Sequence, residues 1–242
     1  MPKRQRQPAQ PAWKFADACV HNESSPRFIL MQRLVEPEIL DRLPADDPEA
    51  VRSRRDLRWI NFLMGNERWL ARRIARLPSA RKGVWEIGAG EGRLLRRLAT
   101  RHPGMSLTGC DLAPRPANLP NRIAWRQGDV FDQLPTASGG VLVANLFLHH
   151  FDDSLLARFG SSLANFDALC INEPHRSSLA MAQGRLLLPF VGPVTRHDML
   201  VSIHAGFRPG ELPEWLGLTA GGWRVREETT WRGALRVLAW RD

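Results

Sequence analysis

The chain has 242 residues, 43% of them hydrophobic, which is enough to bury one sizeable core and does not require two domains. It carries 34 Lys and Arg against 25 Asp and Glu, a formal net charge of +9. A basic balance suits an anionic partner, but the near-exclusive use of arginine equally fits a solvated surface. The net charge is therefore weak support for nucleic acid binding. No apolar run is long enough to predict a membrane span, and no secretory signal is recognised. The three cysteines, Cys19, Cys110 and Cys170, have no metal-like spacing, and their odd number argues against a disulfide framework. These features favour the cytoplasm.

The N-terminal third of the chain is predicted to be an extension of the main domain. Residues 1–26 have the composition of a flexible arm, because they offer little to bury. Apolar residues from Phe28 to Leu43 predict short helices that Pro37 interrupts. We therefore expect a helical extension over residues 27–80 and the main domain over residues 81–242.

Two longer helices are predicted inside this extension. Asp47 can cap the first, with Pro48 in its first turn. Asn66 can cap the second, which Pro78 ends. We expect this helical region to form a lid over a pocket.

From Gly83 onward, strands and helices alternate. Short apolar runs predict strands over residues 84–87, 106–110, 123–126, 141–146, 168–171, 223–230 and 233–240. Helices are predicted over 153–165 and 177–188, whereas 190–207 is predicted to be a loop followed by a short helix. Repeated β-α units predict the α/β class with a doubly wound, mostly parallel sheet, and the final hairpin adds an antiparallel strand.

A glycine-rich turn, Glu86-Ile87-Gly88-Ala89-Gly90-Glu91-Gly92, follows the first of these strands. Glycines there allow a tight turn and close approach of the backbone to a ligand. The spacing is one residue shorter than the dinucleotide pattern G-x-G-x-x-G. The acidic Glu86 suits a cationic amino-acid moiety better than a pyrophosphate. Taken by itself, the motif is also compatible with an ordinary β-α turn.

Polar residues also follow the next three strands. Asp111 ends the second strand, 19 residues after Gly92, where a carboxylate can accept both hydroxyls of a ribose. Asp129 follows the third strand and Asn145 the fourth. Each aspartate alone is equally suited to a turn or cap, but the ordered set predicts a nucleoside cofactor across the strand ends.

Over residues 83–171 this set resembles class I S-adenosylmethionine-dependent methyltransferases. The resemblance implies a Rossmann-like, seven-stranded sheet with the last strand antiparallel, and S-adenosyl-L-methionine as the cofactor. It implies that Asp129 receives the adenine amino group and that Asn145 and Leu146 lie beside the sulfonium. The cofactor-binding residues expected from it are Glu86, Gly88, Ala89, Gly90, Gly92, Asp111, Leu112, Asp129, Val130, Asn145 and Leu146. No metal is expected.

The stretch after the fourth strand, residues 145–151, lacks the N-P-P-[FY] signature of enzymes that methylate base amines. It looks more like enzymes that methylate small molecules such as quinones, phenols or polyketides. Residues 172–176, 196–198 and 205–208 are similar to bacterial methyltransferases of the polyketide type. The resemblance therefore implies a small-molecule acceptor, methylated on a hydroxyl.

A hydroxyl acceptor must be aligned and must lose its proton, for which histidine is the natural base. His149 and His150 follow the fourth strand, where the pocket is expected. Because adjacent residues point apart, we expect one of them to face the substrate and slightly favour His150. Glu173 and His197 are second candidates, and either could instead orient the substrate or the histidine.

Arg54, Arg55 and Asn61 are predicted to help close the pocket and to bind an anionic group of the substrate. A solvated arginine face explains the same residues equally well. Three alternatives stay open: an RNA or protein methyltransferase of the same fold, a nicotinamide-dependent reductase, which the glycine spacing disfavours, and a non-catalytic, partner-binding domain. The sequence does not predict an oligomeric state.

Overall fold

The computed structural model describes residues 31–137 and 139–241. The predicted arm over 1–26 and the apolar residues from Phe28 to Leu30 lie outside these ranges, as does Cys19. Among the described residues, no helix combines the length and the apolar character needed to cross a membrane.

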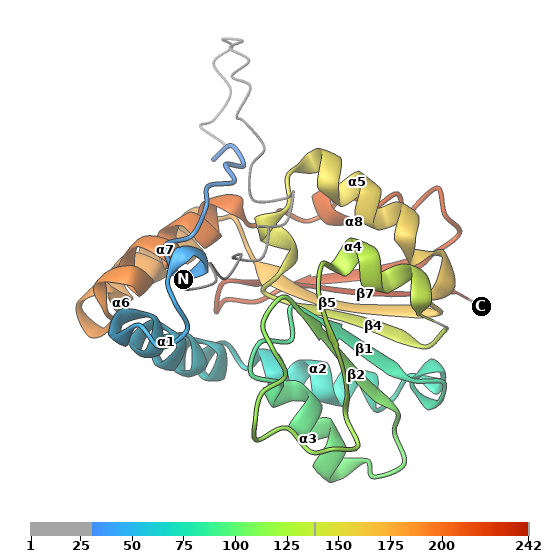
Figure 1. Cartoon of the computed structure of the whole chain (residues 1–242). Helices are drawn as coiled ribbons and strands as arrows, with labels where there is room; N and C mark the ends of the chain where they lie inside the picture. Colours follow the sequence, from blue (N-terminus) through green and yellow to red (C-terminus); the bar gives the residue numbers. More distant parts are fainter. Residues whose placement is uncertain (1–30, 138, 242) are drawn as a thin grey trace, which may run out of the picture.

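Seven strands form one sheet in the order β3-β2-β1-β4-β5-β7-β6 (Figure 1). They are β1 (Val84–Ile87), β2 (Leu107–Asp111), β3 (Ala124–Gln127), β4 (Val141–Asn145), β5 (Ala168–Pro174), β6 (Arg224–Thr229) and β7 (Ala234–Trp240). Strands β1 to β5 pair in parallel, and β7 is antiparallel to both β5 and β6. The predicted fold class is confirmed. Because the strand order reverses between β1 and β4, a ligand crevice is expected outside their carboxyl ends.

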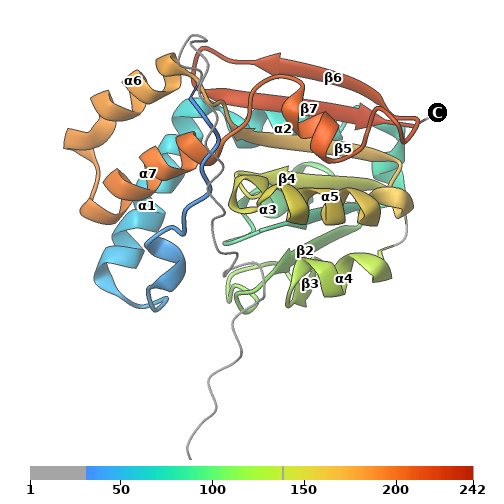
Figure 2. The same cartoon turned by 90° about the horizontal axis from the view of Figure 1, so that it is seen from above.

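Helices cover both faces of this sheet (Figure 2). One face carries α2 (Asn66–Ile74) and α3 (Arg93–Arg101), and the other carries α4 (Val130–Gln133), α5 (Asp153–Ser161) and α8 (Glu211–Trp215). In β4, Val143 packs on the face covered by α2 and α3 and Leu142 on the face covered by α4, α5 and α8, since successive side chains of a strand point to opposite faces. Burial on both faces explains why the parallel strands appear in the sequence as continuous apolar runs.

A third group of helices lies at one end of the sheet in both views (Figures 1 and 2). It comprises α1 (Pro48–Met64), α6 (Ser178–Leu187) and α7 (Pro193–Ala205), joined by a small apolar cluster that includes Ile60, Met181 and Met199. The prediction of a loop and a short helix over 190–207 is wrong, because α7 has 13 residues. This helix lies against α1 and α6 together and is buried on several sides, so it lacks a single apolar stripe.

The segment before α1 also differs from expectation. Residues 31–38 form no helix, and only a short 3-10 turn, η2 (Leu40–Arg42), follows. Tertiary contacts replace the expected helical hydrogen bonds: the backbone N–H groups of Ile39 and Leu40 donate to the carboxylate of Asp198 on α7 (2.8 and 3.0 Å). We call residues 31–43 the strap, since they run along α7 as an irregular segment.

Two further boundaries differ from those predicted. Asn66 is the first residue of α2 and does not cap it; Gly65, with φ 71°, stands between α1 and α2. Strand β5 extends to Pro174 because β7 pairs with it along its whole length. Within the described ranges, five further short 3-10 turns follow η2: η3 (Pro78–Arg81), η4 (Leu134–Thr136), η5 (Leu148–His150), η6 (Ser162–Asn165) and η7 (Leu188–Phe190). The domain boundary at residue 80 stays a prediction.

Candidate active site

A cavity of about 620 Å³ opens at the carboxyl ends of β1, β2 and β4. Its volume lies within the range of about 300–1,000 Å³ that is usual for small-molecule sites. The strand ends form one wall, and the strap with α1, α6 and α7 forms the other. Of the predicted substrate-binding residues, Arg54 and Asn61 line the cavity, whereas Arg55 is exposed and lies outside its lining.

The glycine-rich turn shapes the strand side of the cavity. Gly88, Gly90 and Gly92 have φ values of 59°, 52° and 65°, a region that side chains disfavour. A Cβ on Gly88 would lie 2.3 Å from Cδ2 of Phe147, so this position admits no side chain. A Cβ on Gly90 would meet nothing within 4 Å. The turn therefore leaves open space for a ligand next to its backbone.

Glu86, at the end of β1, lines this space with an unpaired carboxylate oxygen. Its side chain is buried, and Oε2 has no hydrogen-bond partner among the described residues. Burial, and secondarily the charges of Glu67 and Asp111, raise the pKa of Glu86 well above its usual range. A buried acid of this kind can ionise when a cation binds beside it.

Asp111 and Asn145 occupy the ends of the two strands that flank β1. Asp111 accepts hydrogen bonds from the N–H groups of Gly90 (2.7 Å) and Ala113 (2.8 Å), one on each oxygen. Because a carboxylate oxygen can accept more than one hydrogen bond, both oxygens keep capacity for a ligand. Leu146, after Asn145, has a φ of 54°, a strained conformation for a leucine at the cavity wall.

The structure brings together most of the residues predicted to bind the cofactor. Those that line the cavity are Glu86, Gly88, Ala89, Gly90, Asp111, Leu112, Val130, Asn145 and Leu146. Gly92 and Asp129 lie outside the lining. Gly92 precedes α3, where a Cβ would lie 2.6 Å from Leu119, and Asp129 caps α4 by accepting from the N–H of Phe131 (2.9 Å).

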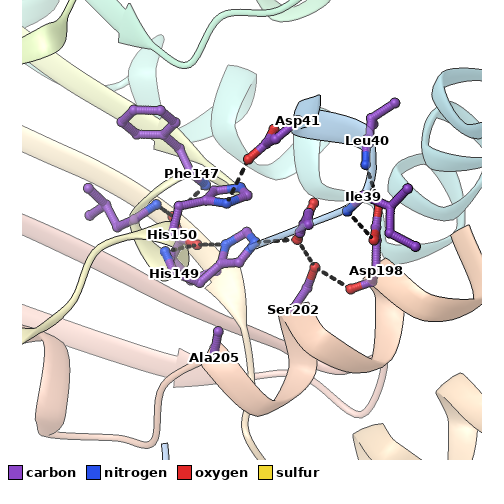
Figure 3. A network of polar contacts seen from close by, with 12 residues as sticks. Ile39, Leu40, Asp41, Phe147, His149, His150, Asp198, Ser202 and Ala205 are labelled. Carbon is purple, nitrogen blue, oxygen red and sulfur yellow. Dashed lines mark hydrogen bonds and ion pairs between the residues drawn. The ribbon is translucent and has the colours of Figure 1, made fainter. Parts of the chain in front are cut away.

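His149 lies between two carboxylates at the base of the cavity (Figure 3). Its Nδ1 is 2.8 Å from Oε2 of Glu173 and its Nε2 is 3.4 Å from Oε1 of Glu38 on the strap. Burial opposes protonation of the ring, but the hydrogen bonds with Glu173 and Glu38 outweigh it and raise the pKa of His149 to about 9. His149 is therefore an imidazolium at neutral pH and has no free nitrogen with which to take a proton.

Glu173 serves to hold the turn η5 in place. Its side chain is fully buried, and it accepts from the backbone N–H groups of Phe147 (3.0 Å), Leu148 (2.8 Å) and His149 (3.3 Å). With His149 Nδ1 these donors occupy both oxygens. The geometry therefore favours a positioning role for Glu173 over proton transfer.

His150 presents the other imidazole of the pair to the cavity (Figure 3). Its Nδ1 lies 3.7 Å from Oδ2 of Asp41 on the strap, and its ring is 4.3 Å from that of His149 between centroids. His197, by contrast, is 47% exposed in its side chain, lies outside the cavity lining and contacts Asp198 (2.9 Å). Of the four candidates, His150 has the best placement for a base.

Sequence reasoning missed the strap residues Glu38 and Asp41. Glu38 is buried and also accepts from the hydroxyl of Ser202 on α7. The electrostatic influence of His150, with hydrogen bonds from His149 and Ser202, lowers the pKa of Glu38 to about 2 despite its burial. No local motif marks these acids, since they reach the histidines only through the tertiary path of the strap.

The imidazolium–carboxylate pairing predicts a pH-dependent stability. His149 has a raised pKa, so its contribution is complete below about pH 6.5 and is lost as the pH rises through about 9. Glu38 has a lowered pKa, so its contribution is present above about pH 4.5 and is lost toward pH 2. In thermal melts, Glu38→Gln should therefore lower the melting temperature most near pH 5–6 and much less above pH 9. The exposed Asp153→Asn is the control, and a Glu38→Gln effect that is constant from pH 6 to 10 would refute the pairing.

Glu38, His149 and His150 also have the donor set of a metal site, with ligand atoms within 4.8 Å of one another. We nevertheless expect no structural metal, because His149 is an imidazolium at neutral pH and a metal would first have to displace its proton. EDTA should leave the melting temperature unchanged, and zinc should not raise it. A drop on chelation that zinc reverses would show that the cluster binds a metal.

Residues 85–159 match the family model described as a methyltransferase domain. Over these residues, which are less than half of the chain, the protein is similar to methyltransferase domains. An uncharacterized methyltransferase of Mycobacterium tuberculosis is 35% identical over 96 residues, which cover 36% of this chain and 47% of that protein. The chain thus spans about half the length of the curated relatives that it matches.

Solved structures of methyltransferases share the fold of this chain. The plantazolicin methyltransferase BamL, in complex with a triazolic desmethylPZN analog and SAH, superposes with a TM-score of 0.65 at 12% identity, over 84% of this chain and 92% of that one. An O-methyltransferase family protein from Burkholderia thailandensis gives a TM-score of 0.50 at 17% identity, over 82% and 64%. These structures confirm the predicted fold, and the family model over residues 85–159 confirms the predicted resemblance to methyltransferases.

Proposed function

We propose that the chain transfers a methyl group from S-adenosyl-L-methionine to a hydroxyl of a small phenolic, quinone or polyketide-type acceptor. The observation that carries the proposal is the meeting of the unpaired Glu86, the glycine turn and His150 along the strand-end wall of one cavity, facing the strap and the helices α1, α6 and α7. The match to a methyltransferase domain over residues 85–159 covers all three of these features.

The residues present fit the cofactor. Glu86 Oε2 would receive its ammonium group, the remaining lone pairs of Asp111 its ribose hydroxyls, and Leu112 and Val130 would flank its adenine. Bound there, the cofactor supplies a methyl group already activated as a sulfonium. Asp129 and Gly92 do not line the cavity. The contacts expected of Asp129 with the adenine and of Gly92 with the ligand therefore stay predictions.

The chain's own residues then align the acceptor and take its proton. His150 accepts the hydroxyl proton, and Asp41, 3.7 Å away, stabilises the resulting imidazolium. Apolar residues such as Leu57, Ile60 and Met199 exclude water and hold the acceptor in reach of the methyl group. Arg54 and Asn61 on α1 are placed to contact a polar group of the acceptor, as the lid hypothesis requires.

Cofactor binding should release a proton from Glu86. In the free protein burial, with the charges of Glu67 and Asp111, raises the pKa of Glu86 well above its usual range and so favours the uncharged acid. The ammonium of the ligand favours the ionised form, so up to about one proton should leave per ligand bound. Calorimetry in buffers of different ionisation enthalpy measures this number, and Glu86→Gln should bring it near zero. Equal proton release by wild type and the variant would contradict the role of Glu86.

The reaction itself is tested with methyl-labelled S-adenosylmethionine and a panel of phenols, hydroquinones and hydroxylated polyketide fragments. We expect label in at least one acceptor, and none with the Asp111→Ala variant. Label appearing in RNA or protein, and in no small molecule, would overturn the acceptor class. Cofactor binding without transfer to any acceptor would favour the non-catalytic alternative.

A further inference from the structure

A second cavity, of about 850 Å³, lies between α2 and the β6–β7 turn. It is lined by six arginines, Arg68, Arg72, Arg73, Arg76, Arg232 and Arg236, with two tryptophans among the remaining residues. No acidic residue of the described chain lines it. We call it the arginine groove. Nothing in the mechanism above uses it.

The charge of the groove is far from neutralised by the protein. Glu228 lies 3.7 Å from Arg73 and 3.4 Å from Arg236, and in the described chain no carboxylate pairs with the other four arginines. Arg232 and Arg236 instead donate to the backbone carbonyls of Leu63 and Met64. About five positive charges therefore remain uncompensated in one concavity, where they create a strong potential for an anion.

The arginines are arranged by the helix and by aromatic stacking. Arg68, Arg72 and Arg76 follow one another at four-residue spacing along α2 and its continuation, so they share one side. Arg73 and Arg236 both lie over the ring of Trp69 (5.9 and 5.1 Å). Stacking and carbonyl contacts hold these guanidinium groups in place before any ligand arrives, which lowers the entropy cost of binding.

Arg236 is destabilised in its charged form by burial and by the neighbouring arginines. Burial lowers the pKa of Arg236, and Arg232 and Arg73 lower it further, against the opposing effect of Glu228. Its Nε is buried without a hydrogen-bond partner among the described residues. A multiply charged anion in the groove would relieve this repulsion and offer an acceptor to several guanidinium groups at once.

The groove adjoins the active-site cavity, since Met64 and Arg232 line both. We propose that the arginine groove binds a phosphate or diphosphate group carried by the methyl acceptor, whose other end reaches past Met64 and Arg232 to His150. Phosphate chemistry suits the groove because each phosphate accepts several bidentate contacts and carries up to two charges, whereas one carboxylate would neutralise one arginine. The link between the groove and the methyl acceptor rests on the proposed function. The binding of an anion in the groove does not.

The test uses inorganic pyrophosphate as the probe, with sodium sulfate at equal ionic strength as the control. The double variant Arg72→Glu/Arg76→Glu is compared with Arg81→Glu/Arg101→Glu, a matched change of charge outside the groove. We expect pyrophosphate to bind wild type, and the groove variant to bind it about tenfold or more weakly. S-adenosylhomocysteine affinity should be unchanged in both variants.

The outcomes separate this inference from the proposed function. If a methyl acceptor is found, pyrophosphate should inhibit transfer competitively with the acceptor and not with the cofactor; inhibition that is not competitive would overturn the link to the acceptor. Pyrophosphate affinity equal to that for sulfate, or equally reduced in the control variant, would overturn the anion site itself. Binding of oligo(U) RNA that strengthens with length and exceeds pyrophosphate binding would assign the groove to nucleic acid instead.

Discussion

Replacing His150 with alanine is expected to lower kcat by about 10²–10⁴-fold, the usual contribution of a well-placed general base. His150 lines the cavity just beyond the end of β4, and Asp41 on the strap lies 3.7 Å from its Nδ1. His149 cannot substitute, because it is an imidazolium held by Glu38 and Glu173. The measurement is steady-state methyl transfer to an acceptor identified in the panel.

Two readouts distinguish a lost base from a damaged site. S-adenosylhomocysteine should bind the His150→Ala variant as tightly as wild type, and the loss should fall on kcat rather than on the KM for the acceptor. His197→Ala is the control, since that side chain is 47% exposed and lies outside the cavity lining. A His150→Ala enzyme with wild-type kcat, or a His197→Ala enzyme with the larger loss, would contradict the assignment.

The second large effect is expected on stability. Glu173→Gln should destabilise the protein by about 3–5 kcal/mol, the usual cost of removing one partner from a buried ion pair. The substitution removes half of the charge that balances the His149 imidazolium. It also brings an amide donor toward N–H groups of the turn η5 that now donate to the carboxylate. Urea unfolding measures the change.

A double-mutant cycle checks that this cost arises from the ion pair. In a His149→Gln background, Glu173→Gln should cost clearly less, because no buried imidazolium is then left unbalanced. Asp153→Asn serves as the surface control: its side chain is 69% exposed, so its pair with Arg33 should contribute at most about 1 kcal/mol. A cost of Glu173→Gln below about 1 kcal/mol, or one that is unchanged in the His149→Gln background, would show that Glu173 is not the anchor described.

The strand side of the site was predictable because its information is local. Glu86, Asp111 and Asn145 each lie at the carboxyl end of a predicted strand. Because parallel strands bring their carboxyl ends to one edge of the sheet, these three residues are expected to lie close together. The choice between Arg54 and Arg55 was not predictable from the sequence. Neighbours on a helix point about 100° apart, so only one could face the cavity, and the sequence does not show which.

The opposite wall could not be predicted for a different reason. Glu38 and Asp41 lie about 110 residues before the histidines that they contact, in a segment whose backbone is held by Asp198 of α7. No periodicity marks such a strap, because its path depends on a helix that is itself buried on several sides and therefore lacks a simple pattern. Tertiary contacts thus decide which candidate histidine is available as a base.

The measurement that tests the central claim most directly is a calorimetric titration of the purified chain with S-adenosylmethionine and S-adenosylhomocysteine, with NADH as the control ligand. We predict saturable binding of one molecule of either adenosyl ligand, no binding of NADH, and a loss of at least about tenfold in affinity in the Asp111→Ala variant. Failure of wild type to bind either adenosyl ligand, or equal binding by wild type and Asp111→Ala, would contradict the assignment of this cavity as the cofactor site.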